Sequence, residues 1–250
     1  MAGKIVIIFD FDRTLIEDDS DRWVFTRMDL TQLFRDLRPT LPWNSLMDRL
    51  LEEMHVLGKS IDDIADCLRG MPLHPSVVSV VKQAHALGCD LKVASDSNQF
   101  YIRTILEHYG IYSCFSEIIT NPAVVDKGRL RIFPYHGSAA PHGCDLCPSN
   151  LCKGRVIEQI QVSLSESESK RLIYIGDGGN DFCPTLKLAA GDFVLPKKDF
   201  PLLSRISKNS NLVKAKVCEW NSSEDLAKIL GKLIECMSNE DKISSSTTQL

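Results

Sequence analysis

The chain has 250 residues, 44% of them hydrophobic and 25% charged, and its formal net charge is −4. This composition is typical of a soluble globular protein, and the charge gives no indication of a nucleic-acid or membrane surface. No apolar run approaches the length of a membrane span, and we expect no secretory signal. The nine scattered cysteines favour free thiols over a disulfide framework. We therefore predict a cytoplasmic protein with no nucleic-acid or membrane partner. The sequence does not determine the oligomeric state.

The first predicted strand, residues 5–9, is an apolar run that ends abruptly in Asp10 and Asp12. Such a run indicates a strand buried on both faces, as in parallel sheets covered by helices. In open α/β sheets ligands bind outside the carboxyl ends of the strands, so we expect Asp10 where chemistry occurs. The alternative is a core strand that simply ends in a polar turn.

Residues 18–72 are predicted to form a small helical insert. Apolar residues recur at three- and four-residue spacing within residues 42–58, and Ser60 with Asp63 predicts the start of a further helix. Residues 72–75 indicate a linker. We therefore predict a core of residues 1–17 and 73–238, the helical insert of residues 18–72, and a disordered tail of residues 239–250.

Strands and helices alternate after the helical insert, which predicts an α/β fold with a doubly wound parallel sheet. Residues 124–132 indicate a hairpin within this alternation. The predicted strands are residues 91–94, 118–120, 172–175 and 193–195. The predicted helices are residues 77–87, 102–109, a segment opened by Lys153, a segment containing residues 186–190, and residues 222–237.

Polar side chains follow three of the predicted strands, and one lysine opens a helix between the last two. The set is Asp10, Asp12, Ser95, Asp96, Lys153, Asp177 and Asp181. If the sheet is parallel, these side chains meet at one edge. Carboxylates with one lysine and one hydroxyl indicate Mg²⁺-assisted phosphoryl chemistry, because Mg²⁺ takes oxygen ligands and aspartate is an established nucleophile towards phosphorus. Ser95 and Lys153 are expected to stabilise the phosphoryl oxygens.

Four of these segments, residues 10–14, Ser95, Lys153 and residues 176–181, match in order the motifs of the haloacid dehalogenase superfamily of phosphatases. The chain resembles that family from residue 5 to residue 195. The resemblance implies a Rossmann-like core with a small cap, to which the helical insert corresponds. It also implies that Asp10 is the nucleophile that forms an aspartyl-phosphate, that Asp12 is the general acid/base, and that Thr14 positions Asp12.

The same resemblance implies a Mg²⁺ site formed by Asp10, the carbonyl oxygen of Asp12, and Asp177. It places Asp181 in the outer shell of that site or in a bond to Lys153. The residues expected to bind the substrate and its phosphate are Thr14, Asp21, Ser95, Asp96, Ser97 and Gly178.

Five shorter segments resemble the phosphoethanolamine/phosphocholine phosphatase branch, and most closely the plant thiamine-phosphate phosphatase-like proteins. They are residues 20–21, 95–98, 121–122, 134–136 and 147–154. The resemblance implies a small, often cationic phosphomonoester as substrate. Thiamine monophosphate is the preferred candidate, with phosphocholine, phosphoethanolamine, pyridoxal phosphate and pyrophosphate as alternatives. Arg13 departs from the residue often found in that branch, which leaves the exact substrate open.

Asp21 and Asp96 are acids that phosphate binding does not require, so we expect them to face a positively charged part of the substrate. The alternative is that both acids cap turns or face water. A phospho-receiver signalling domain is the competing function from another class. The helical insert and the chain length do not fit a small receiver, and Asp12 supplies an acid/base that a receiver lacks.

His142, Cys144, Cys147 and Cys152 are metal-ligating residue types that lie close together in the sequence. One histidine and three cysteines can form a structural Zn²⁺ site. The alternative, which we favour, is a packed loop of free thiols, since the spacing from Cys147 to Cys152 is not typical of zinc fingers.

Overall fold

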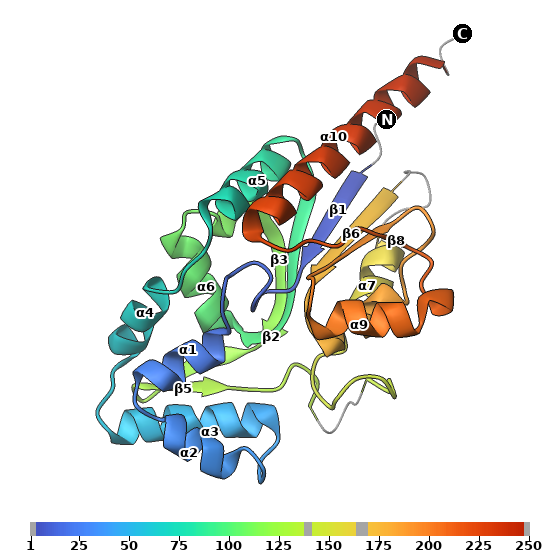
Figure 1. The fold of residues 1–250 in the computed structure, drawn as a ribbon. Coiled ribbons are helices and arrows are strands. Elements are labelled where there is room, and N and C mark those ends of the chain that lie inside the picture. Colours follow the sequence, from blue (N-terminus) through green and yellow to red (C-terminus); the bar gives the residue numbers. More distant parts are fainter. Residues whose placement is uncertain (1–3, 138–141, 164–169, 248–250) are drawn as a thin grey trace.

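The computed structural model describes residues 4–137, 142–163 and 170–247; for residues 4, 163 and 240–247 only the backbone is described. Its centre is a six-stranded parallel sheet with strand order β3-β2-β1-β6-β7-β8 (Figure 1). The strands of this sheet are β1 (Lys4–Phe9), β2 (Asp90–Asn98), β3 (Phe115–Asn121), β6 (Lys170–Gly176), β7 (Phe193–Pro196) and β8 (Lys216–Val217). A separate antiparallel hairpin pairs β4 (Ala123–Asp126) with β5 (Arg129–Ile132).

Helices cover both faces of the sheet. One face carries α5 (Pro75–Ala86), α6 (Gln99–His108) and α10 (Ser223–Thr247), and the other carries α7 (Lys153–Ser163), α8 (Phe182–Thr185) and α9 (Pro201–Lys208). Three short 3₁₀ helices complete the chain at Tyr112–Cys114, Gly179–Asp181 and Ser210–Leu212. The predicted doubly wound parallel sheet is thereby confirmed.

The alternation of side chains along residues 5–9 of β1 explains why this stretch is apolar throughout. Ile7 and Phe9 pack in the cluster with α5, α6 and α10, whereas Val6 and Ile8 pack in the cluster with α7, α8 and α9. Successive side chains of a strand point to opposite faces, so a strand covered on both sides has no polar position. The first polar position, Asp10, therefore falls where β1 leaves the core.

The helical insert contains α1 (Ser20–Arg27), α2 (Thr31–Leu37), α3 (Trp43–Val56) and α4 (Ile61–Arg69), and lies beyond the carboxyl ends of the strands (Figure 1). The expected capping box is present at the start of α4. The β4–β5 hairpin packs on α3, where Arg129 donates to the Asp48 carboxylate at 2.7 Å and to Glu52 at 3.1 Å. The helical insert and the hairpin together thus cover the edge of the sheet where the strands end (Figure 1). Our division of the chain at residues 17 and 72 stays a prediction.

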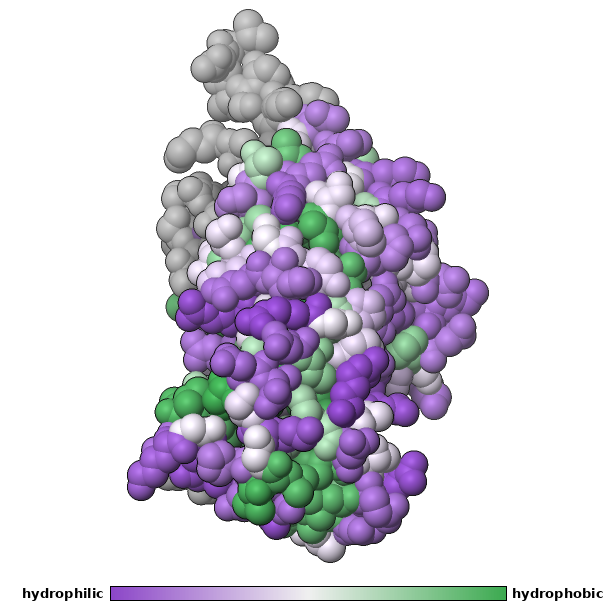
Figure 2. All heavy atoms as spheres, turned by 90° about the vertical axis from the view of Figure 1, so that its left-hand side faces the viewer, coloured by the Kyte–Doolittle hydropathy of each residue, from purple (hydrophilic) through white to green (hydrophobic). Residues whose placement is uncertain are grey.

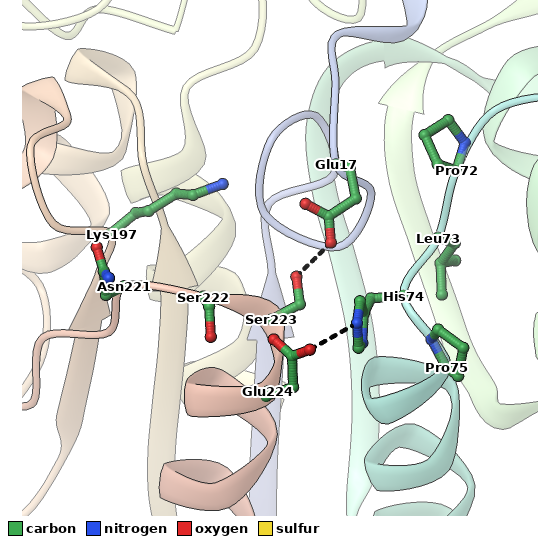
Figure 3. Close-up of a pocket in the computed structure, with 10 residues that line it drawn as sticks. All are labelled: Glu17, Pro72, Leu73, His74, Pro75, Lys197, Asn221, Ser222, Ser223 and Glu224. Atoms are coloured by element: carbon green, nitrogen blue, oxygen red, sulfur yellow. Dashed lines mark hydrogen bonds and ion pairs between the residues drawn. The ribbon is translucent and has the colours of Figure 1, made fainter.

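The two connections between the helical insert and the core lie side by side. The N–H of Glu17 donates to the carbonyl of Pro72 at 3.2 Å. The start of α10 braces both connections: the Ser223 hydroxyl donates to the Glu17 carboxylate at 2.6 Å, and His74 Nε2 lies 2.9 Å from the Glu224 carboxylate. Figure 3 shows the Ser223–Glu17 and His74–Glu224 contacts beside a cavity of about 440 Å³. The start of α10 therefore ties together the two connections between the helical insert and the core.

The structure differs from the sequence-based elements at three places. Strand β2 continues to Asn98 instead of ending at residue 94, because its polar end still pairs with β3 through an irregular register. Helix α8 ends at Thr185, and residues 186–190 are not helical; Asp192 accepts from the N–H groups of Ala189 and Leu172, which ties this turn to β6. Helix α10 continues to Thr247 through most of the segment predicted to be a disordered tail; residues 248–250 lie outside the described residues.

Hydrophobic side chains reach the surface over the helices of the insert, at the lower end of the face in Figure 2. Val56 and Leu57, at the end of α3, are among the exposed hydrophobic residues. Within the described ranges, none of the helices combines the length and apolarity that crossing a membrane requires.

Candidate active site

The polar residues predicted from the strand ends do meet at one edge of the sheet. Asp10 follows β1, Ser95 lies near the end of β2, and Asp177 follows β6. The N–H of Asp10 donates to the carbonyl of Ile175 at 2.8 Å, which extends the pairing of β1 and β6 up to the first acid. Lys153, the first residue of α7, reaches the same point from the other face of the sheet.

Lys153 is buried between two carboxylates that come from different elements. Its Nζ lies 2.7 Å from Asp10 and 2.8 Å from Asp181, and the residue is 1% exposed. Burial by itself lowers the pKa of Lys153, but the Asp10 and Asp181 charges outweigh it and hold that pKa well above the ordinary value. The ammonium group therefore stays charged.

Asp181 is completely buried and saturated with hydrogen-bond donors. Besides Lys153, its carboxylate accepts from the Tyr174 hydroxyl at 2.6 Å and from the N–H groups of Asp177 and Gly178 at 3.1 and 2.8 Å. A side chain at Gly176 would place Cβ 2.5 Å from an Asp181 oxygen, so this close approach requires glycine. Asp181 thus fixes Lys153 and the turn after β6.

Asp177 is held by Thr14, for which the sequence resemblance implies a different partner, Asp12. The Thr14 hydroxyl donates to the Asp177 carboxylate at 3.1 Å, whereas the resemblance implied that Thr14 positions Asp12. Burial and the neighbouring Asp181 raise the pKa of Asp177 to about 6. The N–H of Thr14 donates to the carbonyl of Phe11, so the loop after β1 folds back on itself. The Thr14 hydroxyl can therefore link this loop to the loop after β6.

The carboxylates of Asp10, Asp177 and Asp181 lie within 4.8 Å of one another. Lys153 is the only ammonium group that the described structure brings into ion-pair contact with them, so the cluster is two positive charges short of neutrality. Burial and the Asp181 charge raise the pKa of Asp10 well above its ordinary value. A set of oxygen donors with this charge deficit fits a divalent cation such as Mg²⁺.

Asp12 stands apart from that cluster. Its carboxylate accepts from the N–H of Ser20 at 2.7 Å, and burial together with Asp19 raises its pKa to about 7. Arg13, which lies between Asp12 and Thr14 in the chain, has a φ of 57°, in the left-handed region that few non-glycine residues adopt. An acid with this pKa can give or take a proton near neutral pH.

A cavity of about 150 Å³ opens between these groups. Its wall consists of Asp10, Asp12, Arg13, Asp19, Asp21, Trp43, Ser95, Asp96, Asp177, Gly178 and Asn180. The Ser95 oxygen accepts from the N–H of Ser97 at 3.1 Å, which leaves its own proton for a ligand. The Ser97 hydroxyl instead bonds to Ser20 at 2.8 Å, and the N–H of Gly178 is used by Asp181.

The two extra acids have different surroundings. Asp21 is 6% exposed and accepts from the Trp43 indole N–H at 3.0 Å, while burial and the charges of Asp19 and Asp12 raise its pKa well above the ordinary value. Asp96 instead accepts from two side-chain amides, Asn150 at 2.9 Å and Asn180 at 2.7 Å. No basic side chain among the described residues forms an ion pair with Asp21, whereas both Asp96 oxygens already have donors.

A second cavity of about 1310 Å³ adjoins the first and shares Trp43, Asp96 and Asn180 with it. It lies between the helical insert and residues 132–137 and 142–150, with Asn44, Asp48 and Pro148 among its lining residues. The sequence analysis missed Asn150, Asn180, Tyr174 and Trp43. Asn180 and Asn150 lie inside the motifs at residues 176–181 and 147–154, which could have identified them.

The parallel sheet, the acids at its edge and the buried lysine are the arrangement that the resemblance to the haloacid dehalogenase superfamily of phosphatases implies. Solved structures agree on the fold: a phospho-aspartyl intermediate analogue of phosphoserine phosphatase aligns with a TM-score of 0.60 at 18% identity, over 92% of this chain and 99% of that one. Residues 5–234 match the family Put_Phosphatase, described as "Putative Phosphatase". The chain belongs to this phosphatase family.

Curated relatives carry several names. The chain is 54% identical to a thiamine phosphate phosphatase-like protein of Arabidopsis thaliana, over 96% of this chain and 99% of that protein. It is 50% identical to inorganic pyrophosphatase 2 of Arabidopsis thaliana, over 96% and 87% of the two chains. It is 32% identical to the human pyridoxal phosphate phosphatase PHOSPHO2, over 93% and 99%. The class of enzyme is thus shared, while the substrates in these names differ.

The buried contacts of Lys153 predict a measurable stability effect. Lys153→Met leaves two buried carboxylates without a counter-charge, so the free energy of unfolding should fall by roughly 3–5 kcal/mol in metal-free buffer. The double variant with Asp181→Asn should recover part of that loss. Lys187→Met, which breaks an ion pair with Glu158 at the surface, is the control and should cost no more than about 1 kcal/mol. Equal losses in urea unfolding for Lys153→Met and Lys187→Met would contradict the prediction.

Proposed function

We propose that the protein is a Mg²⁺-dependent phosphatase that hydrolyses a small, cationic phosphomonoester through an aspartyl-phosphate, with thiamine monophosphate as the preferred substrate. The support comes from the cavity beside Asp10, where acids outnumber basic side chains although a phosphate must bind there. Lys153 and a divalent cation would neutralise the negative charge of the bound phosphate. Asp21 is a buried acid whose ionised form is disfavoured by its surroundings, and a ligand whose other end is positive would stabilise that form.

The proposed reaction uses the residues in order. The Asp10 carboxylate attacks phosphorus while Asp12 donates a proton to the leaving oxygen. Lys153 and the Ser95 hydroxyl then stabilise the charge on the transferring phosphoryl group. Asp12, now ionised, takes a proton from the water that hydrolyses the aspartyl-phosphate. Asp10, Asp177 and the Asp12 carbonyl would hold Mg²⁺, which supplies neutralisation of the phosphoryl charge.

The two cavities support a substrate with an organic part. The smaller one has room for a phosphoryl group, and the larger one begins at Trp43 and Asp96, next to Asp21. Phosphocholine and phosphoethanolamine also carry a positive end, whereas pyridoxal phosphate and pyrophosphate do not combine a fixed cation with one phosphate ester. A phosphate-release screen over these five compounds, with and without Mg²⁺, tests the proposal; the highest kcat/KM for pyrophosphate would overturn it.

The role of Asp10 can be tested with an isosteric change. Asp10→Asn removes the attacking carboxylate, so turnover should fall by more than about 10³-fold while the far-ultraviolet circular dichroism stays the same. Asp36→Asn, at an exposed position of α2, is the matched control and should keep full activity. A variant of Asp10 that retains a tenth of the turnover would rule out this nucleophile.

The Thr14–Asp177 hydrogen bond allows the proposed Mg²⁺ requirement to be tested at a residue that orients a metal ligand. Chelation with EDTA should abolish turnover and added Mg²⁺ should restore it. Thr14→Val removes the hydroxyl that orients Asp177, so the Mg²⁺ concentration for half-maximal activity should rise roughly 10- to 100-fold. Activity that persists without metal argues against the Mg²⁺ site, and an unchanged half-saturating concentration in Thr14→Val argues against the role of this hydroxyl.

Charge selection by Asp21 can be separated from general damage to the site. A partly desolvated carboxylate that faces a cation contributes on the order of 1–3 kcal/mol. Asp21→Asn should therefore lower kcat/KM for thiamine monophosphate roughly 5- to 100-fold and change p-nitrophenyl phosphate hydrolysis much less. Asp96→Asn should lower both, because Asp96 orients two amides. Equal losses for both substrates in Asp21→Asn would show that Asp21 only maintains the cavity.

A further inference from the structure

Four cysteines converge at a point that the proposed reaction does not use. Cys144, Cys147 and Cys152 come from residues 142–152, which we call the cysteine loop, and Cys183 comes from α8. Their sulfur atoms all lie within 4.8 Å of one another. His142, which the sequence analysis placed in a possible metal site, is not part of this group. Cys183 takes the fourth position instead.

The distances between the sulfurs match a tetrahedral metal centre and not a disulfide. Cys183 Sγ lies 3.6 Å from Cys144 Sγ and 3.9 Å from Cys152 Sγ. Four sulfurs placed about 2.3 Å from a central Zn²⁺ are about 3.8 Å apart, whereas a disulfide bond is about 2.0 Å long. All four cysteines are free thiols in the described structure.

Backbone groups around the cluster are arranged to stabilise negative sulfur. The N–H of Gly154 donates to Cys183, and the N–H of Arg155 donates to Cys152. Both N–H groups belong to the first turn of α7, where the helix has no internal acceptor for them and its dipole favours negative charge. A side chain at Gly154 would place Cβ 2.4 Å from Cys183 Sγ, so glycine is required for this approach.

His142 shapes the cysteine loop without joining the cluster. Its Nδ1 accepts from the N–H of Cys144 at 3.1 Å, and its Nε2 lies 2.8 Å from the carbonyl of Pro148. Gly143, between His142 and Cys144, has a φ of 66°, which glycine adopts without strain. These contacts hold Cys144 and Cys147 on the side that faces Cys183. His142, a possible metal ligand in the sequence, therefore positions Cys144 instead.

We propose that these four cysteines bind one structural Zn²⁺ ion. Each thiol loses its proton to solvent as its sulfur binds the metal, and the four thiolates fill the tetrahedral sphere, so the site has no open position for catalysis. The described residues of the cysteine loop contain no helix or strand, so a metal cross-link supplies the order that hydrogen-bonded elements do not. The link also fixes Cys152 beside Lys153, and Cys183 near Asp181.

Metal content and ligand identity test the proposal directly. Full-length protein purified without chelator should contain about one zinc atom per chain by elemental analysis, with sulfur neighbours at about 2.3 Å in X-ray absorption. Apoprotein titrated with Co²⁺ should develop thiolate-to-cobalt charge-transfer absorption, which Mg²⁺ does not displace. Less than a tenth of a zinc atom per chain together with no cobalt absorption would overturn the proposal. A disulfide between two of the four cysteines in the freshly purified protein would also overturn it.

Substitutions separate this cluster from the other thiols. Cys183→Ser and Cys147→Ser should each lose most of the bound zinc and lower the melting temperature by roughly 5 °C or more. Cys218→Ser, at a half-buried cysteine outside the cluster, should keep both at the wild-type value. Wild-type zinc content in Cys183→Ser would contradict the assignment. If the serine variants fail to fold, chelation of the wild-type protein must produce the same fall in melting temperature, and no fall would count against the proposal.

Discussion

One buried ammonium group joins the parts of the site. Lys153 lies between Asp10 and Asp181, so it connects the first residue after β1 to the turn after β6, and it does so from the start of α7. Two carboxylates this deep in a protein would repel each other and be costly to ionise without that charge. The tight glycine turn at Gly176, the saturated hydrogen bonds of Asp181 and the burial of Lys153 follow from this pairing.

The fold was predictable from the sequence because its main constraint is local. Residues 5–9 of β1 are all buried, so this stretch is apolar throughout and its end is marked by Asp10. The alternation of such strands with helices determines a parallel sheet, and a parallel sheet brings the strand ends to one edge. The same reasoning predicts that Asp10, Ser95, Lys153 and Asp177 lie together at that edge.

Contacts between distant loops were not predictable in the same way. The Thr14 hydroxyl bonds to Asp177 across the sheet edge, and Cys183 joins the three cysteines for which the sequence offered His142 as a possible fourth ligand. Neither partner lies at a fixed spacing from the other, because the register between loops depends on how whole strands and helices pack. Helix α8 ended early for a related reason: Asp192 ties the following turn to β6, against the helical preference of its residues.

The cysteine loop links the phosphate end of the site to the helical insert through one side chain. Asn150 is 7% exposed; its oxygen accepts from the N–H of Tyr135 at 3.0 Å and from Asn44 of α3 at 3.3 Å, and its amide donates to Asp96. Asp96 is the neighbour of Ser95 and also accepts from Asn180. A shift of α3 therefore changes the donors available to Asp96, one residue from the hydroxyl that faces the phosphate. Because buried polar groups are costly to leave unpaired, this chain favours one position of the insert over the edge of the sheet.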